Sequence, residues 1–133
     1  MVAKVYGIRG ATTVLVNTTT AIREAVMELL DTIELHNHLN TEDIISVIFT
    51  ATRDLDAIFP AAIARERPNW DHIPLLDLQQ MHVQKSLERC IRILIYINSP
   101  HDSSEITHVY LRNAKNLRPD ISLDSILPDT FRH

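Results

Sequence analysis

The spacing of apolar residues predicts two helices in the first half of the chain. The longer one follows the possible N-caps of residues 17–20 and is expected to reach about His36. Its apolar stripe recurs at helical spacing and is formed by Ile22, Val26, Leu29, Leu30 and Ile33. The shorter helix is expected over residues 61–66, because Pro60 suits a first helical turn and Pro68 ends the pattern.

Runs of β-branched and apolar residues predict the strands. A first strand over residues 2–8 is closed by Gly7 and Gly10. A nearly continuous apolar run over residues 44–49 is typical of a strand buried on both faces. Further extended segments are expected over residues 73–76, 87–97 and 107–112. In the second of these segments the isoleucines share one face, and the other face carries Arg92, Leu94 and Tyr96.

These elements predict an α+β fold in the order β-α-β-α-β-β, with a mixed sheet and both helices on one face. Two helices can cover only one face of a four- or five-stranded sheet. The second and third strands are nevertheless too apolar for their other face to meet water, so we expect another subunit to cover it. Loops and the tail are the alternative cover. Residues 1–133 are expected to form a single domain, with 119–133 as a loosely ordered tail after the last strand.

Charge and composition exclude several classes of partner. The chain carries 13 Lys and Arg against 17 Asp and Glu, and its cations form no stripe, so no nucleic-acid partner is expected. The longest apolar stretch, residues 93–97, is too short to span a bilayer, and the N-terminus lacks a secretory pattern. Cys90 is the only cysteine, which excludes an intrachain disulfide and fits a cytoplasmic protein.

The sequence lacks the motifs of covalent, metal and redox chemistry. Residues 7–10 do not have the spacing of a phosphate loop, and no Cys/His set has the spacing of a zinc site. Cys90 opens an apolar strand, where a cysteine is more often packed in the core than reactive. We therefore expect no cofactor and no metal. What remains is a set of arginines at element edges, namely Arg9, Arg65, Arg92 and Arg118.

Arg92 is the most informative of these arginines. Its neighbours are Ile91 and Ile93, so it is expected to project from an apolar strand into a confined space. A guanidinium in such a place is costly unless a carboxylate, ordered polar groups or an anionic ligand pairs with it. The sequence leaves two interpretations open, a structural ion pair with Asp77 or another acid, and a site for an anion.

Several motifs, in order along the chain, resemble the trimeric chorismate mutases. The resemblance runs from about residue 5 to residue 123 and is carried by Gly7–Thr13, Ala57–Ala61, Arg65–Glu66, Cys90–Arg92, His108–Arg112 and Leu117–Asp120. It implies a pseudo-α/β barrel in which three subunits place their sheets inside and their helices outside, with active sites between subunits. It also implies conversion of chorismate to prephenate, by a Claisen rearrangement without a cofactor, on the route to phenylalanine and tyrosine.

The resemblance further implies roles for individual residues. Arg92 would donate to the ether oxygen and the side-chain carboxylate of chorismate, and Arg9 and Tyr110 would bind the same carboxylate. Arg65 and Arg118 would lie at the edge of the site. The residues expected to pack on the substrate ring are Phe59 and Ala61 from the neighbouring subunit, with Leu75, Leu76 and Leu117.

The chain departs from the family pattern at three positions. Gln80 stands where the family usually has a glutamate, Asp77 where it usually has a cysteine, and Ala62 where it often has a lysine. By the resemblance, that glutamate hydrogen-bonds the substrate hydroxyl and neutralises the central arginine. If this segment turns helically, positions 77 and 80 share a face, so our hypothesis is that Asp77 supplies the missing negative charge while Gln80 still donates or accepts hydrogen bonds. The alternatives are that Asp77 points to solvent and weakens the site, that the protein is a non-catalytic metabolite-binding trimer, or that it is a purely structural oligomer.

Overall fold

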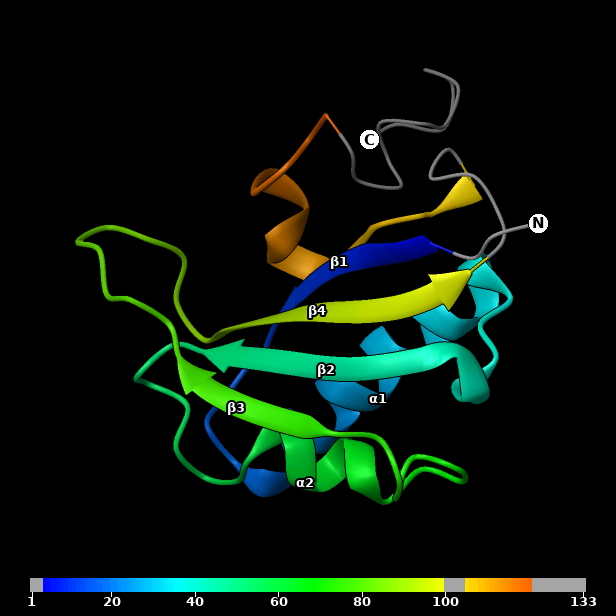
Figure 1. The fold of residues 1–133 in the computed structure, drawn as a ribbon. Coiled ribbons are helices and arrows are strands. Elements are labelled where there is room, and N and C mark those ends of the chain that lie inside the picture. The colour runs from blue at the N-terminus through cyan, green and yellow to red at the C-terminus, as the bar shows by residue number, and fades with distance from the viewer. Residues whose placement is uncertain (1–3, 100–104, 121–133) are drawn as a thin grey trace.

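The computed structural model describes residues 4–99 and 105–120, and these build one mixed five-stranded sheet with its helices on one face (Figure 1). The strands are β1 (Lys4–Thr13), β2 (Ile44–Ala51), β3 (Leu75–Gln79), β4 (Cys90–Ser99) and β5 (Val109–Tyr110). The helices are α1 (Thr19–Asn37) and α2 (Pro60–Arg65), with the 3-10 turns η1 (Thr41–Asp43) and η3 (Arg112–Asn116). The predicted α+β class and the single helical layer are confirmed.

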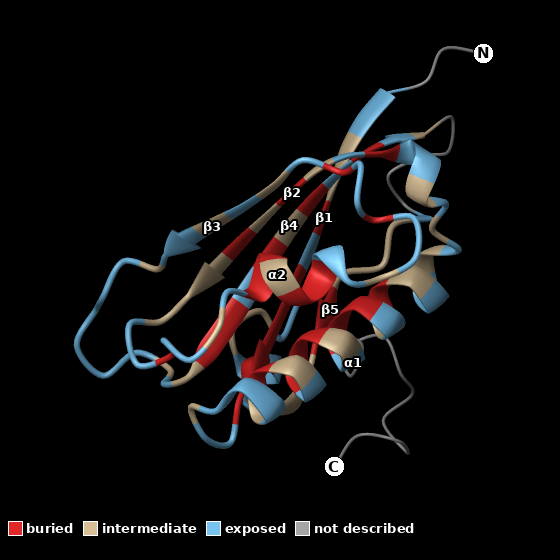
Figure 2. Ribbon diagram, turned by 90° about the horizontal axis from the view of Figure 1, so that it is seen from below, coloured by how far each residue is buried: buried red, intermediate tan, exposed pale blue. Residues whose placement is uncertain are grey.

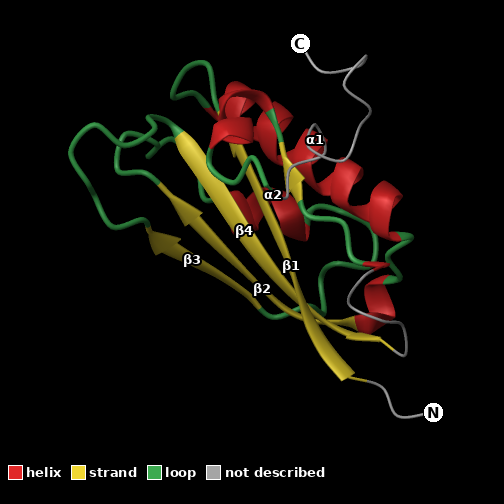
Figure 3. Ribbon diagram, turned by 90° about the horizontal axis from the view of Figure 1, so that it is seen from above, coloured by secondary structure: helices red, strands yellow, loops and turns green. Residues whose placement is uncertain are grey.

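The sheet has the strand order β3-β2-β4-β1-β5. The three central strands pair antiparallel, β2 with β4 and β4 with β1, whereas the edge strands β3 and β5 are parallel to their neighbours. Figures 2 and 3 show both helices on the same side of the sheet, so the molecule has two layers.

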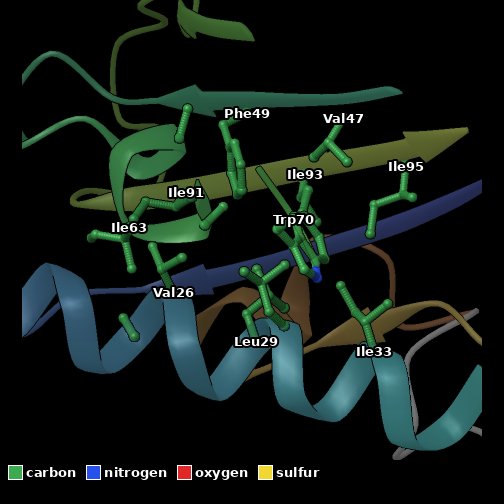
Figure 4. Close-up of a cluster of buried hydrophobic side chains, with 14 of the residues drawn as sticks. Val26, Leu29, Ile33, Val47, Phe49, Ile63, Trp70, Ile91, Ile93 and Ile95 are labelled. Atoms are coloured by element: carbon green, nitrogen blue, oxygen red, sulfur yellow. The ribbon is translucent and has the colours of Figure 1, made fainter. Parts of the chain in front are cut away.

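The core lies between α1 and the sheet. Helix α1 begins where the Thr18 hydroxyl accepts a hydrogen bond from the Ala21 N–H at 3.1 Å, and it ends at His38 in the left-handed conformation. Its predicted apolar stripe is fully buried against the alternate isoleucines of β4 (Figure 4). Trp70 closes this core, and its indole N–H donates to Glu34 at 3.0 Å, which satisfies the buried polar end of the ring.

The other face of the sheet carries no helix within the described residues. Leu76 and Leu78 of β3 are 53% and 48% exposed there, and Tyr96 of β4 is also exposed. We call this side the open face. Apolar side chains on a sheet face without a covering layer are the feature from which the sequence predicts an oligomer, and that assembly stays a prediction.

The first strand is longer than the pattern predicts. Gly7 and Gly10 do not close it, because β1 pairs with β4 without interruption from Lys4 to Thr13. A Cβ on Gly10 would lie 2.8 Å from Ile93 Cγ2 and 3.0 Å from Ile33 Cδ1. This glycine therefore allows α1 to pack closely on the sheet, and the interpretation of it as a strand stop is wrong.

Other boundaries also shift. The extended piece expected over 73–76 is β3, which starts at Leu75 and continues through Asp77, and the strand expected over 107–112 shortens to Val109–Tyr110. Arg112, with a φ of 53°, turns the chain into η3 where a loop was expected. Most of the predicted tail, residues 121–133, lies outside the described residues. In the part of the chain that is described, no helix is long and apolar enough to cross a membrane.

Candidate active site

Strand pairing aligns one row of side chains on the open face. Thr50 of β2 lies opposite Arg92 of β4, and Arg92 lies opposite Ala11 of β1. Ala11 pairs in turn with Tyr110 of β5, and Thr50 pairs with Leu78 of β3. Residues that pair directly point to the same face of a sheet. These five residues, which we call the Arg92 row, therefore cross all five strands on one side.

Arg9 joins this row from the neighbouring position on β1. It precedes Ala11 by two residues and so lies on the same face. Arg9, Arg92, Tyr110 and Thr50 all line one cavity of about 300 Å³. The structure thus brings together the three residues to which the family resemblance gives the polar contacts.

The two cavity arginines have no carboxylate partner. Within the described residues, neither Arg9 nor Arg92 forms an ion pair, whereas ion pairs are formed by Arg23, Arg67, Arg89, Arg112 and Arg118. Arg92 is exposed in the single chain, so the expected confinement is wrong at this level. Within one chain, Arg92 also forms no ion pair with Asp77. Two guanidiniums without a carboxylate partner beside one cavity are able to bind an anion.

Tyr110 supplies a neutral hydroxyl to this site. Burial raises the pKa of Tyr110, although the positive charges of Arg9, Arg118 and Arg92 oppose the effect. The phenol therefore keeps its proton at neutral pH and can donate a hydrogen bond to an anion. Tyr110 is buried beside Leu117, which packs against the same small cluster after η3.

Arg118 and His108 lie near Arg9 and Tyr110 but do not line the cavity. Arg118 donates two hydrogen bonds to Asp120, at 3.0 and 2.8 Å, so its guanidinium is held by the chain itself. His108 Nδ1 accepts the backbone N–H of Arg9 at 3.0 Å. Burial and the charges of Arg9 and Arg118 lower the pKa of His108, which keeps its ring neutral and able to accept. The sequence places His108 in one of the family motifs but does not show what its imidazole ring contacts. For that reason His108 was given no role in the sequence analysis.

A second cavity lies near the start of α2. It has a volume of about 570 Å³, shares no lining residue with the first cavity, and is lined by the β2–α2 connection, Phe59, Pro60 and Asp77. Phe59 is 70% exposed, which is unusual for a phenylalanine in a folded domain. Arg65 is exposed at the end of α2. The predicted ring-packing residues Phe59 and Ala61 are thus separate from Arg92 in one chain.

Asp77 does not take the position expected for it. Residues 75–79 form a strand and not a helical turn, and Asp77 pairs with Phe49, whose side chain is buried in the core under the helices. Asp77 therefore points to the helical face, away from the Arg92 row. Its Oδ1 accepts the N–H of Ala61 at 3.0 Å. Burial raises its pKa, while the Ala61 N–H and the charge of Arg65 oppose that shift. Within one chain, Asp77 is not the counter-charge of Arg92.

Gln80 does lie on the side of Arg92. It follows β3 and donates its N–H to the Ala51 carbonyl at 2.9 Å, which extends the ladder by one residue. Alternation along the strand gives it the face of Leu78. Its Oε1 is buried and has no hydrogen-bond partner in residues 4–99 and 105–120. No described group thus occupies Gln80 Oε1, and the contact of Gln80 with the substrate stays a prediction.

The described residues contain few groups for other chemistry. Cys90 is buried, and burial raises the pKa of its thiol, although Arg92 nearby opposes the effect. That makes it a packing residue and not a nucleophile. Among residues 4–99 and 105–120, no three His, Cys, Asp or Glu side chains gather in a way that could hold a metal ion.

Comparisons with known proteins identify the family. Residues 5–121 match the family described as chorismate mutase type I. The chain belongs to this family. The chorismate mutase AroH of Bacillus subtilis (strain 168) is 40% identical to it over 119 residues, which cover 90% of this chain and 94% of that relative. The chorismate mutase AroH of Thermus thermophilus is 42% identical over 118 residues, covering 88% and 96%.

A solved structure agrees with these relatives. A chorismate mutase from Clostridium thermocellum has a TM-score of 0.80 with this chain at 44% identity, covering 84% of this chain and 98% of that one. The family predicted from the sequence motifs is therefore confirmed. This chorismate mutase is an enzyme of the isomerase class, and the alternative of a non-catalytic binding protein is not favoured.

Proposed function

We propose that the cavity beside the Arg92 row is the substrate site in which chorismate rearranges to prephenate. The observation that carries this proposal is the convergence of Arg9, Arg92 and Tyr110 on one cavity with neither arginine in an ion pair. Chorismate carries two carboxylates, and planar guanidiniums bind carboxylates through paired hydrogen bonds. Arg9 and Tyr110 bind the side-chain carboxylate, and Arg92 spans that carboxylate and the ether oxygen.

The rearrangement needs no nucleophile, acid or base from the protein. The site first holds the substrate in the compact conformer in which the two bond-forming carbons approach each other, which is an effect of orientation. As the C–O bond breaks ahead of C–C formation, negative charge grows on the ether oxygen. A fixed guanidinium donor stabilises that charge more strongly in the transition state than in the substrate, so Arg92 accelerates the reaction.

The site is completed by a neighbouring subunit in a homotrimer. This proposal is supported by the exposed apolar side chains of the open face and by the two cavities that share no residue within one chain. Phe59, Ala61 and Arg65 of one subunit then meet the Arg92 row of the next. Leu76 of β3 completes the apolar wall on the substrate ring, with Leu117 beside Tyr110. Leu75 does not share that wall within its own chain, because it pairs with the buried Val47 and packs against the core.

In that arrangement Asp77 acts across the interface. It lines the same cavity as Phe59, so it would face the Arg92 of the adjacent subunit and not that of its own chain. Its negative charge then compensates for the neutral Gln80. Arg118 remains at the edge of the site, where it attracts the dianion. The isomerase would act in the cytoplasm, in the synthesis of phenylalanine and tyrosine, and its single, buried cysteine suits a reducing compartment.

The proposal is tested by the rate at which purified protein removes the absorbance of chorismate. Arg92→Lys is expected to reduce kcat by roughly a thousandfold, the scale of losing a strong oxyanion donor, because an ammonium cannot span two oxygens. Arg23→Lys is a matched control, since Arg23 pairs with Glu66 between the two helices and not on the open face. A rate for Arg92→Lys within a few-fold of the parent would contradict the role of Arg92.

A further inference from the structure

The resemblance gives position 80, here Gln80, the contact with the ring hydroxyl of chorismate; we propose that the hydroxyl of Thr50 is a second contact to that same group. The proposal rests on the substrate site described above. Thr50 lines the same cavity as Arg92 and lies directly opposite it in the β2–β4 register. Neither the motifs of the sequence nor the resemblance gave Thr50 a role.

The Thr50 hydroxyl lacks a partner in the free chain. Its Oγ1 is buried, and no group of residues 4–99 and 105–120 forms a hydrogen bond with it. A threonine hydroxyl commonly bonds to a neighbouring strand, as that of Thr52, directly after β2, does when it accepts the Cys90 N–H at 2.9 Å. Buried polar groups without a partner are rare in native proteins and call for an explanation. Here the explanation is a ligand.

The position of Thr50 in the row selects the part of the ligand that it contacts. Arg92 separates Thr50 from Ala11 and Tyr110, which lie on the far side, toward β5. The carboxylate bound by Tyr110 and Arg9 is therefore on the other side of Arg92 from Thr50. On the Thr50 side, the described polar groups include the hydroxyl itself and Gln80, which lies two residues beyond Leu78, directly after the end of β3.

The hydrogen-bonding capacities of these two groups fit a ligand hydroxyl. A threonine hydroxyl can donate one bond and accept others, and an amide oxygen can only accept. Within the described residues, Gln80 Oε1 is also buried without a partner. A ring hydroxyl would donate to Gln80 Oε1 while its oxygen accepts from Thr50. Both orphaned groups would then be satisfied by one ligand group, with each donor matched to an acceptor.

This arrangement makes Thr50 a determinant of specificity. A site built to bind a hydroxyl rejects an analogue that lacks it, because its own polar groups are then left unpaired. The chain accordingly is expected to discriminate against dianions that have the carboxylates of chorismate but no ring hydroxyl.

Thr50→Val and Thr50→Ser test the proposal. Valine keeps the shape of threonine and removes the hydroxyl, so kcat/KM for chorismate should fall by roughly tenfold, whereas serine should stay within about threefold of the parent. The unliganded melting temperature of Thr50→Val should be equal to the parent value or higher, since an unpaired buried hydroxyl has been removed. Thr32→Val is the matched control, because the Thr32 hydroxyl bonds to Glu28 on α1.

A dianionic chorismate analogue without the ring hydroxyl isolates the contact. As a competitive inhibitor, this analogue should bind the parent and Thr50→Val about equally. In a double-mutant cycle the Thr50 hydroxyl contributes to binding only when the ligand carries the ring hydroxyl that it contacts. An unchanged kcat/KM in Thr50→Val would overturn the proposal, and so would an equal loss for chorismate and the analogue. A melting temperature that falls with the activity would assign the hydroxyl a structural partner instead. A parent protein that does not consume chorismate at all would refute the proposed function, which is a different result.

Discussion

The backbone N–H of Arg9 donates to Nδ1 of His108 at 3.0 Å, just before the parallel pairing of β1 with β5 begins. The bond ties the segment that carries Arg9 to the strand that carries Tyr110. It requires a neutral imidazole with its proton on Nε2, because a protonated ring has no acceptor. The pKa of His108 is lowered by burial first, and then by Arg9 and Arg118, so the bond persists at neutral pH.

Acidification is therefore expected to act through His108. A histidine whose pKa is lowered by folding takes up its proton first in the unfolded chain. Its contribution to stability is present above about pH 6.5 and is lost as the pH falls through that value toward the folded pKa. In the folded enzyme the Arg9 bond is lost only at lower pH, as the pH falls through the lowered pKa of His108, and the KM for chorismate should rise there.

The test compares His108→Leu with His108→Asn. Leucine removes the acceptor and should raise KM by roughly three- to tenfold at neutral pH, while asparagine keeps an acceptor near the position of Nδ1. Initial rates from about pH 5 to about pH 8 should show that the rise of KM on acidification, which protonation of His108 causes in the parent, is absent from both variants. If His108→Leu has the KM of the parent at all pH values, the bond to Arg9 does not position the arginine.

Gly10→Ala is expected to destabilise the fold. The new Cβ would meet Ile93 Cγ2 at 2.8 Å and the Val109 carbonyl oxygen, a backbone atom, at 3.2 Å. Overpacking of this kind costs about 1–3 kcal/mol, which denaturant unfolding can measure. Gly7→Ala is the control on the same strand, because its nearest atom is the flexible end of Leu94 at 3.3 Å. Equal unfolding midpoints for the two variants would contradict the close packing of α1 at Gly10.

Asp77 is expected to combine a structural and an electrostatic role that two substitutions can separate. Asp77→Ala removes the acceptor of the Ala61 N–H and should lower the free energy of unfolding by about 1 kcal/mol. Asp77→Asn keeps an oxygen for that N–H but removes the charge, so its stability should be close to that of the parent while kcat/KM falls. Unchanged turnover and substrate affinity in Asp77→Asn would reject the charge compensation across the interface.

The open face is expected to be a subunit interface, and Leu78 tests it. Leu78→Lys places a charge among the exposed apolar side chains of β3 and should dissociate the trimer, with loss of activity because each site needs two subunits. Leu35→Lys is the control, since Leu35 is 71% exposed on α1, in the helical layer. Sedimentation of both variants measures the assembly. A trimer that survives Leu78→Lys would place the interface elsewhere.

The sequence by itself determined the elements whose signal is periodic. The apolar stripe of α1 and the alternation of β4 each depend on residues close together in the chain, so they could be found from spacing alone. The same alternation assigned Arg92 to the face opposite the isoleucines, which the structure confirms. The family was also accessible, because its motifs are short and occur in order.

Only the tertiary structure decided which distant residues meet. Thr50 faces Arg92, and Asp77 faces Ala61, because hydrogen bonds between separate strands set the register, and a shift of one residue would reverse both faces. Local pattern cannot fix that register for a strand as short as β3. The extent of β1 was decided in the same way, since its pairing with β4 continues through Gly10, where Ile33 and Ile93 leave no room for a Cβ.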